Sequence, residues 1–88
     1  MQVEFRKTFK QDLKNLKDSK VLKRIQKVVE EVELANALSE VRNVKLLQGH
    51  ESFYRIRVGD YRIGLFVDGE TIAFVRVLHR KEVYRYFP

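Results

Sequence analysis

The sequence contains no cysteine, a single proline at position 88, and four glycines that all lie in its second half. Without cysteine, disulfide bridges, thiolate-bound zinc, iron–sulfur clusters and cysteine nucleophiles are excluded, and a reducing compartment is expected. No apolar run approaches the roughly 18 residues of a membrane span, and residues 1–4 lack the pattern of a signal peptide. These absences predict a soluble, cytoplasmic protein that has no membrane contact.

The size and charge of the chain further limit the number of domains and the kind of partner that can be expected. At 88 residues and 10.5 kDa, residues 1–88 are expected to form one small domain, and the apolar 44% must serve a single core. Eighteen lysines and arginines against twelve acidic residues give a formal charge of +6 and a pI near 9.8. Such a balance indicates a polyanionic partner.

The first half of the chain has the periodicity of two amphipathic helices. Thr8, with Gln11 after it, fits a capping box for the first helix, and Ser19 is expected to cap a second that runs to about residue 34. Apolar residues recur at spacings of three and four, namely Phe9, Leu13 and Leu16, then Leu22, Ile25, Val29 and Val32. Residues 35–43 fit either a last helical turn or a loop.

From residue 44 onward the pattern has the period of two that is typical of strands. A short strand is predicted at residues 44–47, and longer strands at residues 53–58, 61–67 and 70–78. Gly59-Asp60 and Asp68-Gly69 are two-residue hairpin signals between the longer strands. The predicted fold is α+β, with two amphipathic helices packed on one face of a small, twisted, mainly antiparallel sheet.

Two-residue turns predict which residues face each other. The first hairpin then pairs Arg57 with Arg62 and Arg55 with Gly64, and the second pairs Gly64 with Ala73. One face is predicted to be core and comprises Tyr54, Ile56, Val58, Tyr61, Ile63, Leu65, Ile72, Phe74 and Leu78. The other is predicted to be cationic and comprises Arg55, Arg57, Arg62, Gly64, Phe66, Thr71, Ala73 and His79.

The arginines of this second face predict a binding site for an anion. No acidic side chain of the neighbouring strands shares the face, and Gly64 beside Ala73 leaves a low floor, so a shallow basic trough is expected. The planar fork of arginine suits phosphate. The alternative is that strand arginines merely solvate the open side of the sheet.

The carboxyl end interleaves basic and aromatic side chains, in the order His79, Arg80, Lys81, Tyr84, Arg85 and Tyr86. This composition suits RNA, because aromatic rings stack on bases while cations hold phosphates. Alternatively, Val83, Tyr84 and Phe87 fold the end of the chain back onto the core. No metal site or cofactor is expected, because the two histidines lack metal-ligand spacing and no glycine-rich phosphate loop is present.

The order of elements and two local strings resemble the RelE family of bacterial and archaeal toxins. The strings are Tyr-Arg-Ile-Arg-Val-Gly-Asp-Tyr-Arg-Ile at residues 54–63 and His-Arg-Lys-Glu-Val-Tyr at residues 79–84. The resemblance spans essentially the whole chain, and ParE-like toxins share parts of both strings. It implies a metal-independent, ribosome-dependent endoribonuclease that cleaves mRNA and is neutralised by a RelB-like antitoxin.

The resemblance also implies site residues. The family's basic residues correspond to Arg55, Arg57, Arg62 and Arg80, and its carboxyl-terminal tyrosine corresponds to Tyr84, at a shorter spacing than in familiar members. Lys81 and Arg85 are added as RNA-binding residues. The reaction implied is attack of a ribose 2′-hydroxyl on the adjacent phosphate, stabilised by preorganised cations.

The general base of that reaction is open at the level of the sequence. Familiar members have lysine where this chain has arginine, and arginine does not release its proton. Side-chain alternation suggests His79 as the general base, and Lys81 and Tyr84 are less favoured alternatives. Two other functions stay open: a ParE-like inhibitor of DNA gyrase without catalysis, and a basic RNA-binding module.

Overall fold

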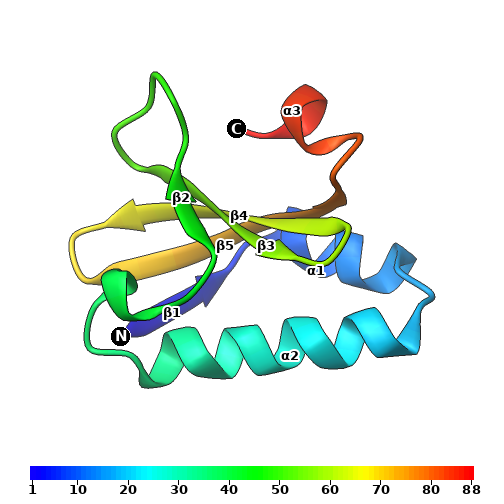
Figure 1. Cartoon of the computed structure of the whole chain (residues 1–88), viewed down its shortest axis with the longest axis horizontal. Coiled ribbons are helices and arrows are strands. Elements are labelled where there is room, and N and C mark those ends of the chain that lie inside the picture. Colours follow the sequence, from blue (N-terminus) through cyan, green and yellow to red (C-terminus); the bar gives the residue numbers. More distant parts are fainter.

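The computed structural model describes all of residues 1–88 and shows a five-stranded sheet with helices on both faces (Figure 1). The strands are β1 (Gln2–Phe5), β2 (Val44–Leu46), β3 (Phe53–Val58), β4 (Tyr61–Asp68) and β5 (Thr71–His79). The helices are α1 (Lys7–Asn15), α2 (Ser19–Leu34), a 3-10 turn η1 (Leu38–Glu40) and the short α3 (Val83–Tyr86). This confirms the predicted α+β class, with α1 and α2 on one side of the sheet and α3 on the other.

The strands lie in the order β1-β5-β4-β3-β2, and only the β1–β5 pair is parallel. A parallel pair requires a long crossover, and the two helices and three strands between β1 and β5 supply it. No helix is sufficiently long and apolar to cross a membrane.

The helix boundaries agree with the periodicity, but the caps differ. Asp18, one residue before the predicted Ser19, caps α2, since its carboxylate accepts hydrogen bonds from the backbone N–H groups of Lys20 and Val21. Thr8 lies inside α1 and does not cap it. Its hydroxyl donates instead to the carbonyl oxygen of Val75 on β5, a tertiary contact that no local pattern reports.

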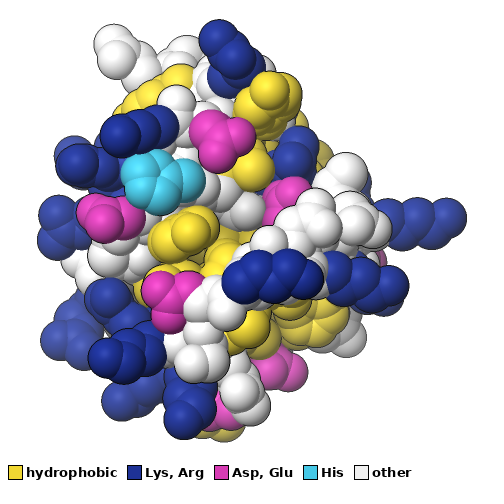
Figure 2. Space-filling view, turned by 90° about the vertical axis from the view of Figure 1, so that its right-hand side faces the viewer, with side chains coloured by type: hydrophobic (Ala, Val, Ile, Leu, Met, Phe, Trp, Pro, Cys, Tyr) yellow, Lys and Arg dark blue, Asp and Glu magenta, His cyan; other side chains and the backbone are white.

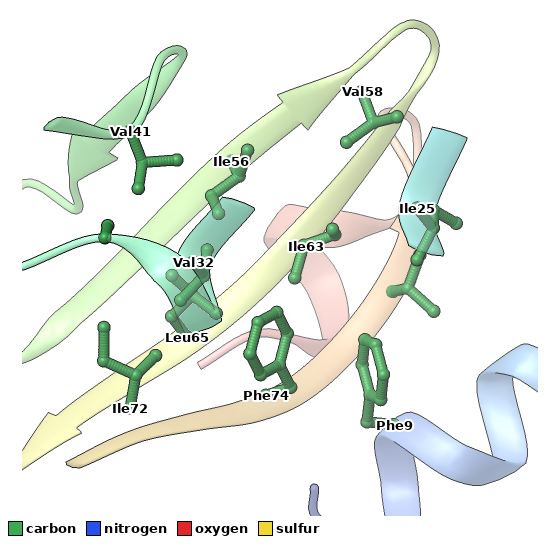
Figure 3. Packing of buried hydrophobic residues seen from close by; sticks show 12 residues of the cluster. Phe9, Ile25, Val32, Val41, Ile56, Val58, Ile63, Leu65, Ile72 and Phe74 are labelled. Carbon is green, nitrogen blue, oxygen red and sulfur yellow. The ribbon is translucent and has the colours of Figure 1, made fainter. Parts of the chain in front are cut away.

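The core fills the space between the sheet and the two long helices (Figure 3). Phe9 of α1 and Ile25 of α2 point at strand residues such as Ile63 and Phe74, and each of the four is at most 2% exposed. Most of the predicted core face is confirmed, with Tyr54 and Tyr61 packed at its margin. Burial of this side of the sheet leaves the opposite side for function.

The first hairpin has the predicted register. Val58 pairs with Tyr61, Arg57 with Arg62, and Arg55 with Gly64. Gly59 takes a φ of +60° at the first position of the turn, a conformation that glycine adopts without strain. The arginine alternation across this hairpin is therefore confirmed.

The register predicted for the second hairpin was wrong. The turn is Gly69-Glu70, so Asp68 pairs with Thr71 and Phe66 with Ala73. The sequence string Asp-Gly suggests a turn with glycine in second place, whereas Gly69, with a φ of +61°, occupies first place. One glycine supports either turn, and the long-range pairing decides between them.

A β-bulge then reverses the alternation of β5. Leu65 pairs with Phe74, but its neighbour Gly64 pairs with Arg76, which leaves Val75 without a partner residue. Val77 consequently points into the core at 3% exposure, in the place expected for Leu78. Leu78 pairs with Arg62, and His79 pairs with Tyr61 on the helix side of the sheet. The predictions of Leu78 as core and of His79 on the arginine face were both wrong.

Candidate functional site

Three arginines from β3 and β4 project from the sheet face opposite the long helices. Arg55 and Arg57 are alternate residues of β3, and Arg62 lies directly across from Arg57 on β4. They line a hollow of about 380 Å³, which we call the trough, with Asn43, Val44 and Lys45. Lys45, paired with Arg55 from β2, is a cation that the sequence analysis did not name. The sequence does contain a signal for Lys45, because the alternation of residues 44–47 places this one cation on the same face as the arginines.

The positive charge of the trough is not balanced within the protein. The structure contains two side-chain ion pairs, Arg76–Asp12 and Arg80–Asp60, and neither involves Arg55, Arg57 or Arg62. Burial lowers the pKa of Arg62, and the charges of Arg55 and Arg57 lower it further. An external anion would relieve this repulsion.

Backbone contacts hold Arg62 in the trough. Its Nη1 donates to the carbonyl oxygens of Gly59 and Tyr61, at 2.8 and 2.9 Å. The tight turn of β3 and β4 therefore orients the guanidinium before any ligand arrives. Preorganisation of this kind is what stabilisation of a developing charge requires.

The carboxyl-terminal segment adds a tyrosine and a fourth arginine to this face. Arg55 donates from Nη1 to the hydroxyl of Tyr84, and its guanidinium carbon lies 5.4 Å from the centre of the Tyr84 ring. Tyr84 is nevertheless 70% exposed. Arg80 forms an exposed ion pair with Asp60 at 3.8 Å, and its charge also contributes to the lowered pKa of Arg62. The structure thus groups Tyr84 and Arg80 with the three strand arginines.

The floor expected between Gly64 and Ala73 is covered. Gly64 faces Arg76 rather than Ala73, and a Cβ atom built on Gly64 would lie 2.7 Å from the ring of Phe87. Phe87 is 4% exposed and packs edge-on against Phe53, with ring centres 5.6 Å apart. The predicted folding of the tail onto the core is therefore confirmed for Val83 and Phe87, whereas Tyr84 stays exposed and its part in RNA binding stays a prediction.

Three of the sequence-predicted residues lie away from the trough. His79 lines a separate hollow with Asp12 and Tyr61, and its Nδ1 accepts a hydrogen bond from the backbone N–H of Lys81 at 3.2 Å. The side chains of Lys81 and Arg85 are exposed and line neither hollow. Figure 2 shows the face that lies on the right-hand side of Figure 1, where basic side chains are dense along the left edge and acidic ones are scattered among them.

Arg76 is a structural residue that the sequence analysis passed over. Its Nε and Nη2 both donate to the Asp12 carboxylate, at 2.7 and 3.0 Å, and the backbone N–H of Val77 donates to the same group. These bonds to Asp12 raise the pKa of Arg76. One acid of α1 thus neutralises the remaining strand arginine and leaves the trough arginines unpaired.

Comparison with known proteins assigns the family. Residues 3–84 match the family model described as ParE toxin of the type II toxin–antitoxin system parDE. The chain is also 48% identical to Toxin RelE3 of Methanocaldococcus jannaschii over 89 aligned residues, which cover all of both chains. This chain belongs to the RelE/ParE family of type II toxins.

Solved structures of RelE-like toxins have the same fold. A RelB–RelE antitoxin–toxin complex from Methanococcus jannaschii contains a chain that is 47% identical, with a TM-score of 0.83 over 97% of this chain and 99% of that one. An archaeal RelE–RelB complex from Pyrococcus horikoshii OT3 matches at 24% identity with a TM-score of 0.71, over 90% and 93% of the two chains, and supports the fold alone. The resemblance inferred from the sequence strings is confirmed at the level of the family.

Proposed function

We propose that this RelE-like toxin is an endoribonuclease that cleaves mRNA on the ribosome. The observation that carries the proposal is the trough itself, where three arginines without acidic partners lie together and the backbone orients one of them, Arg62. A phosphodiester is the ligand whose charge and geometry match such a group.

In the proposed reaction the ribose 2′-oxygen forms a bond to the adjacent phosphorus as the bond from phosphorus to the 5′-oxygen breaks. The products are a 2′,3′-cyclic phosphate and a free 5′-hydroxyl. Arg55, Arg57 and Arg62 hold the phosphoryl oxygens and stabilise the charge that grows on them, and Arg80 contributes from the margin. The protein supplies position and charge, which are the main requirements of phosphoryl transfer.

Proton transfer is assigned to Tyr84 in this proposal. Tyr84 touches Arg55 and remains open to a substrate, so its hydroxyl can deliver a proton to the leaving 5′-oxygen while the 2′-hydroxyl proton passes to water. Its ring also offers a surface on which a base can stack. His79 has no part, because the bulge places it on the other side of the sheet.

We also propose that a RelB-like antitoxin neutralises the protein. Two of the matched archaeal structures are complexes of RelE with RelB, and one of them shares 47% identity with this chain. A net charge of +6 suits an acidic partner segment. Co-expression with a cognate RelB-like antitoxin is expected to yield a stable complex, and failure to co-purify would contradict this part of the proposal.

The decisive experiment is a primer-extension map of mRNA in a translating extract, with and without the protein. Cuts in phase with codons are expected, and they should vanish in ribosome-free extract. The match to a ParE toxin model favours one alternative, a gyrase inhibitor without nuclease activity. An intact mRNA together with inhibited DNA supercoiling would support that alternative and overturn the nuclease proposal.

A further inference from the structure

A second basic hollow adjoins the trough around the edge of the sheet. It has a volume of about 260 Å³ and lies between α2 and the β2–β3 edge, and we call it the side hollow. Its cations are Arg24, Lys27, Arg42 and Arg57. Glu31 is its one acidic residue, and none of these side chains forms an ion pair.

The side hollow and the trough form one continuous cationic surface. Asn43 and Arg57 line both of them. Asn43 has a φ of +65°, and its carbonyl oxygen accepts a hydrogen bond from the backbone N–H of Arg57 at 3.1 Å, so the junction is held by the backbone. From the far side, Arg24 reaches the β3–β4 turn, with its guanidinium against Gly59. Seven cations thus line a path from α2 to the centre of the trough.

We propose that the side hollow binds the phosphate backbone of RNA, at a point on the same strand beyond the phosphate held in the trough. The inference rests on the proposed function only in taking RNA as the ligand of the trough. Uncompensated, closely spaced cations repel one another, and a polyanion that follows the path relieves the repulsion at several points together. Arginine accounts for three of the four cations and matches phosphate with two parallel hydrogen bonds.

The composition of the side hollow favours RNA over an antitoxin peptide. Of its three apolar residues, Ile56 and Val58 are 1% and 3% exposed, and only Val28 is partly exposed, so the hollow offers little anchoring surface. An amphipathic segment requires exposed apolar contacts. Such contacts exist elsewhere, in a groove between α1 and α2 lined by residues such as Phe5 and Leu22. The side hollow provides four cations and one partly exposed apolar side chain, a balance that suits a sugar–phosphate chain better than an amphipathic peptide.

The test measures the binding of a single-stranded oligoribonucleotide whose 2′-hydroxyls are methylated, so that it cannot be cleaved. Fluorescence anisotropy over a series of salt concentrations gives the slope of log affinity against log salt, which decreases by about 0.7 for each lost phosphate contact on a single strand. The double variant Arg24→Gln, Lys27→Gln is expected to lose about 1.4 from this slope. Should the double variant fail to fold, Arg42→Gln, an exposed loop change, is expected to lose about 0.7.

The matched control is the double variant Lys7→Gln, Lys14→Gln, which removes the same charge from exposed positions of α1. It is expected to retain the wild-type slope. Equal slopes for the two double variants would overturn the proposal. Loss of the antitoxin complex without a change in slope would show a peptide site and would also overturn it. Because the probe cannot be cleaved, an extract assay that shows no mRNA cleavage would refute the proposed nuclease and leave this result standing.

Discussion

The side chain of Arg62 is held in a fixed orientation although its neighbouring arginines repel its charge. Two backbone carbonyl groups hold its guanidinium, while burial first and then the charges of Arg55 and Arg57 lower its pKa. A lowered pKa means that folding disfavours the charged form, and this cost persists at every pH below the folded-state pKa. Across neutral pH the protein therefore keeps three repelling charges, which an anionic ligand stabilises.

The first prediction concerns Arg62→Ala. Cleavage of mRNA in the translating extract is expected to fall by about 10³-fold or more, because an arginine aimed at a phosphoryl group contributes on that scale in related chemistry. The free energy of unfolding should change by less than about 1 kcal/mol, because relief of like-charge repulsion offsets the lost hydrogen bonds. Cleavage near the wild-type rate would remove Arg62 from the proposed site.

The second prediction concerns His79→Ala. The imidazole lies on the helix side of the sheet against Tyr61, with ring centres 5.4 Å apart, so cleavage is expected to remain close to wild type. Removal of a residue that transfers a proton in the reaction costs about 10²- to 10⁴-fold. A loss in that range, measured by single-turnover primer extension, would show that His79 takes part in proton transfer and would contradict the proposed mechanism.

At the scale of elements, α1 protects the part of β5 that β1 does not cover. β1 ends opposite Phe74, and beyond it Thr8 bonds the carbonyl of Val75 while Asp12 bonds the N–H of Val77. An exposed strand edge would otherwise present unpaired backbone groups. The helix therefore completes the sheet at the bulge, where the direction of the later side chains is decided.

The third prediction concerns Asp12→Ala. The change removes two charged hydrogen bonds to Arg76 and one to the Val77 backbone, so the free energy of unfolding is expected to fall by about 2–4 kcal/mol. Because the pKa of Arg76 is raised, its contribution is fully present below the ordinary arginine pKa and is lost only as pH rises through the higher folded value. Urea denaturation measures the loss, with Glu33→Ala as an exposed control.

The fourth prediction concerns the contact between the tail and the sheet. Gly64→Ala places a methyl group 2.7 Å from the Phe87 ring, so the free energy of unfolding should fall by about 1–3 kcal/mol. Displacement of Phe87 also moves Tyr84 from Arg55, and mRNA cleavage is expected to fall with it. Gly64 has no positive φ, so the contact with Phe87 is the expected cause; Gly49→Ala, with a φ of +81° and open space around it, shows for comparison the cost of backbone strain without a clash. Equal stability of Gly64→Ala and wild type would show that the tail does not rest on the sheet.

At the scale of the whole molecule, a small apolar core supports a surface with a large excess of positive charge. Twelve buried residues form the main cluster, and eighteen basic side chains against twelve acidic ones form only two ion pairs. Repulsion spread over the surface therefore opposes folding, and binding of anions or of an acidic partner favours it.

The fifth prediction follows from that excess. Raising sodium chloride from about 0.01 M to 1 M shortens the screening length from about 30 Å to 3 Å, so the melting temperature of the free protein is expected to rise. Arg57→Gln, which removes the charge opposite Arg62, should raise the melting temperature at low salt and show a smaller gain on adding salt. A melting temperature that falls with salt would indicate that ion pairs dominate the surface.

Short-range information was sufficient for the two long helices, for the strands from residue 44 onward and for the first hairpin. The helices, the longer strands and the placement of Arg55, Arg57 and Arg62 on one face follow from the spacing of apolar residues and from the Gly59 turn. Each of these features depends on residues a few positions apart, whose conformational preferences can be inferred from the sequence. The resemblance to RelE toxins depends on the same local strings.

The tertiary structure alone decided which further groups meet at the site. The bulge at Val75, the parallel β1, the cover of Phe87 over Gly64 and the convergence of Lys45 and Arg24 on the arginines depend on contacts between distant segments. One extra residue in a strand, or a glycine in first or second place of a turn, changes the local energy little. The extra residue, however, reverses every later side chain of its strand, and the other turn shifts the pairing by two residues. Only the packing of the complete core and of α1 against β5 selects between these outcomes.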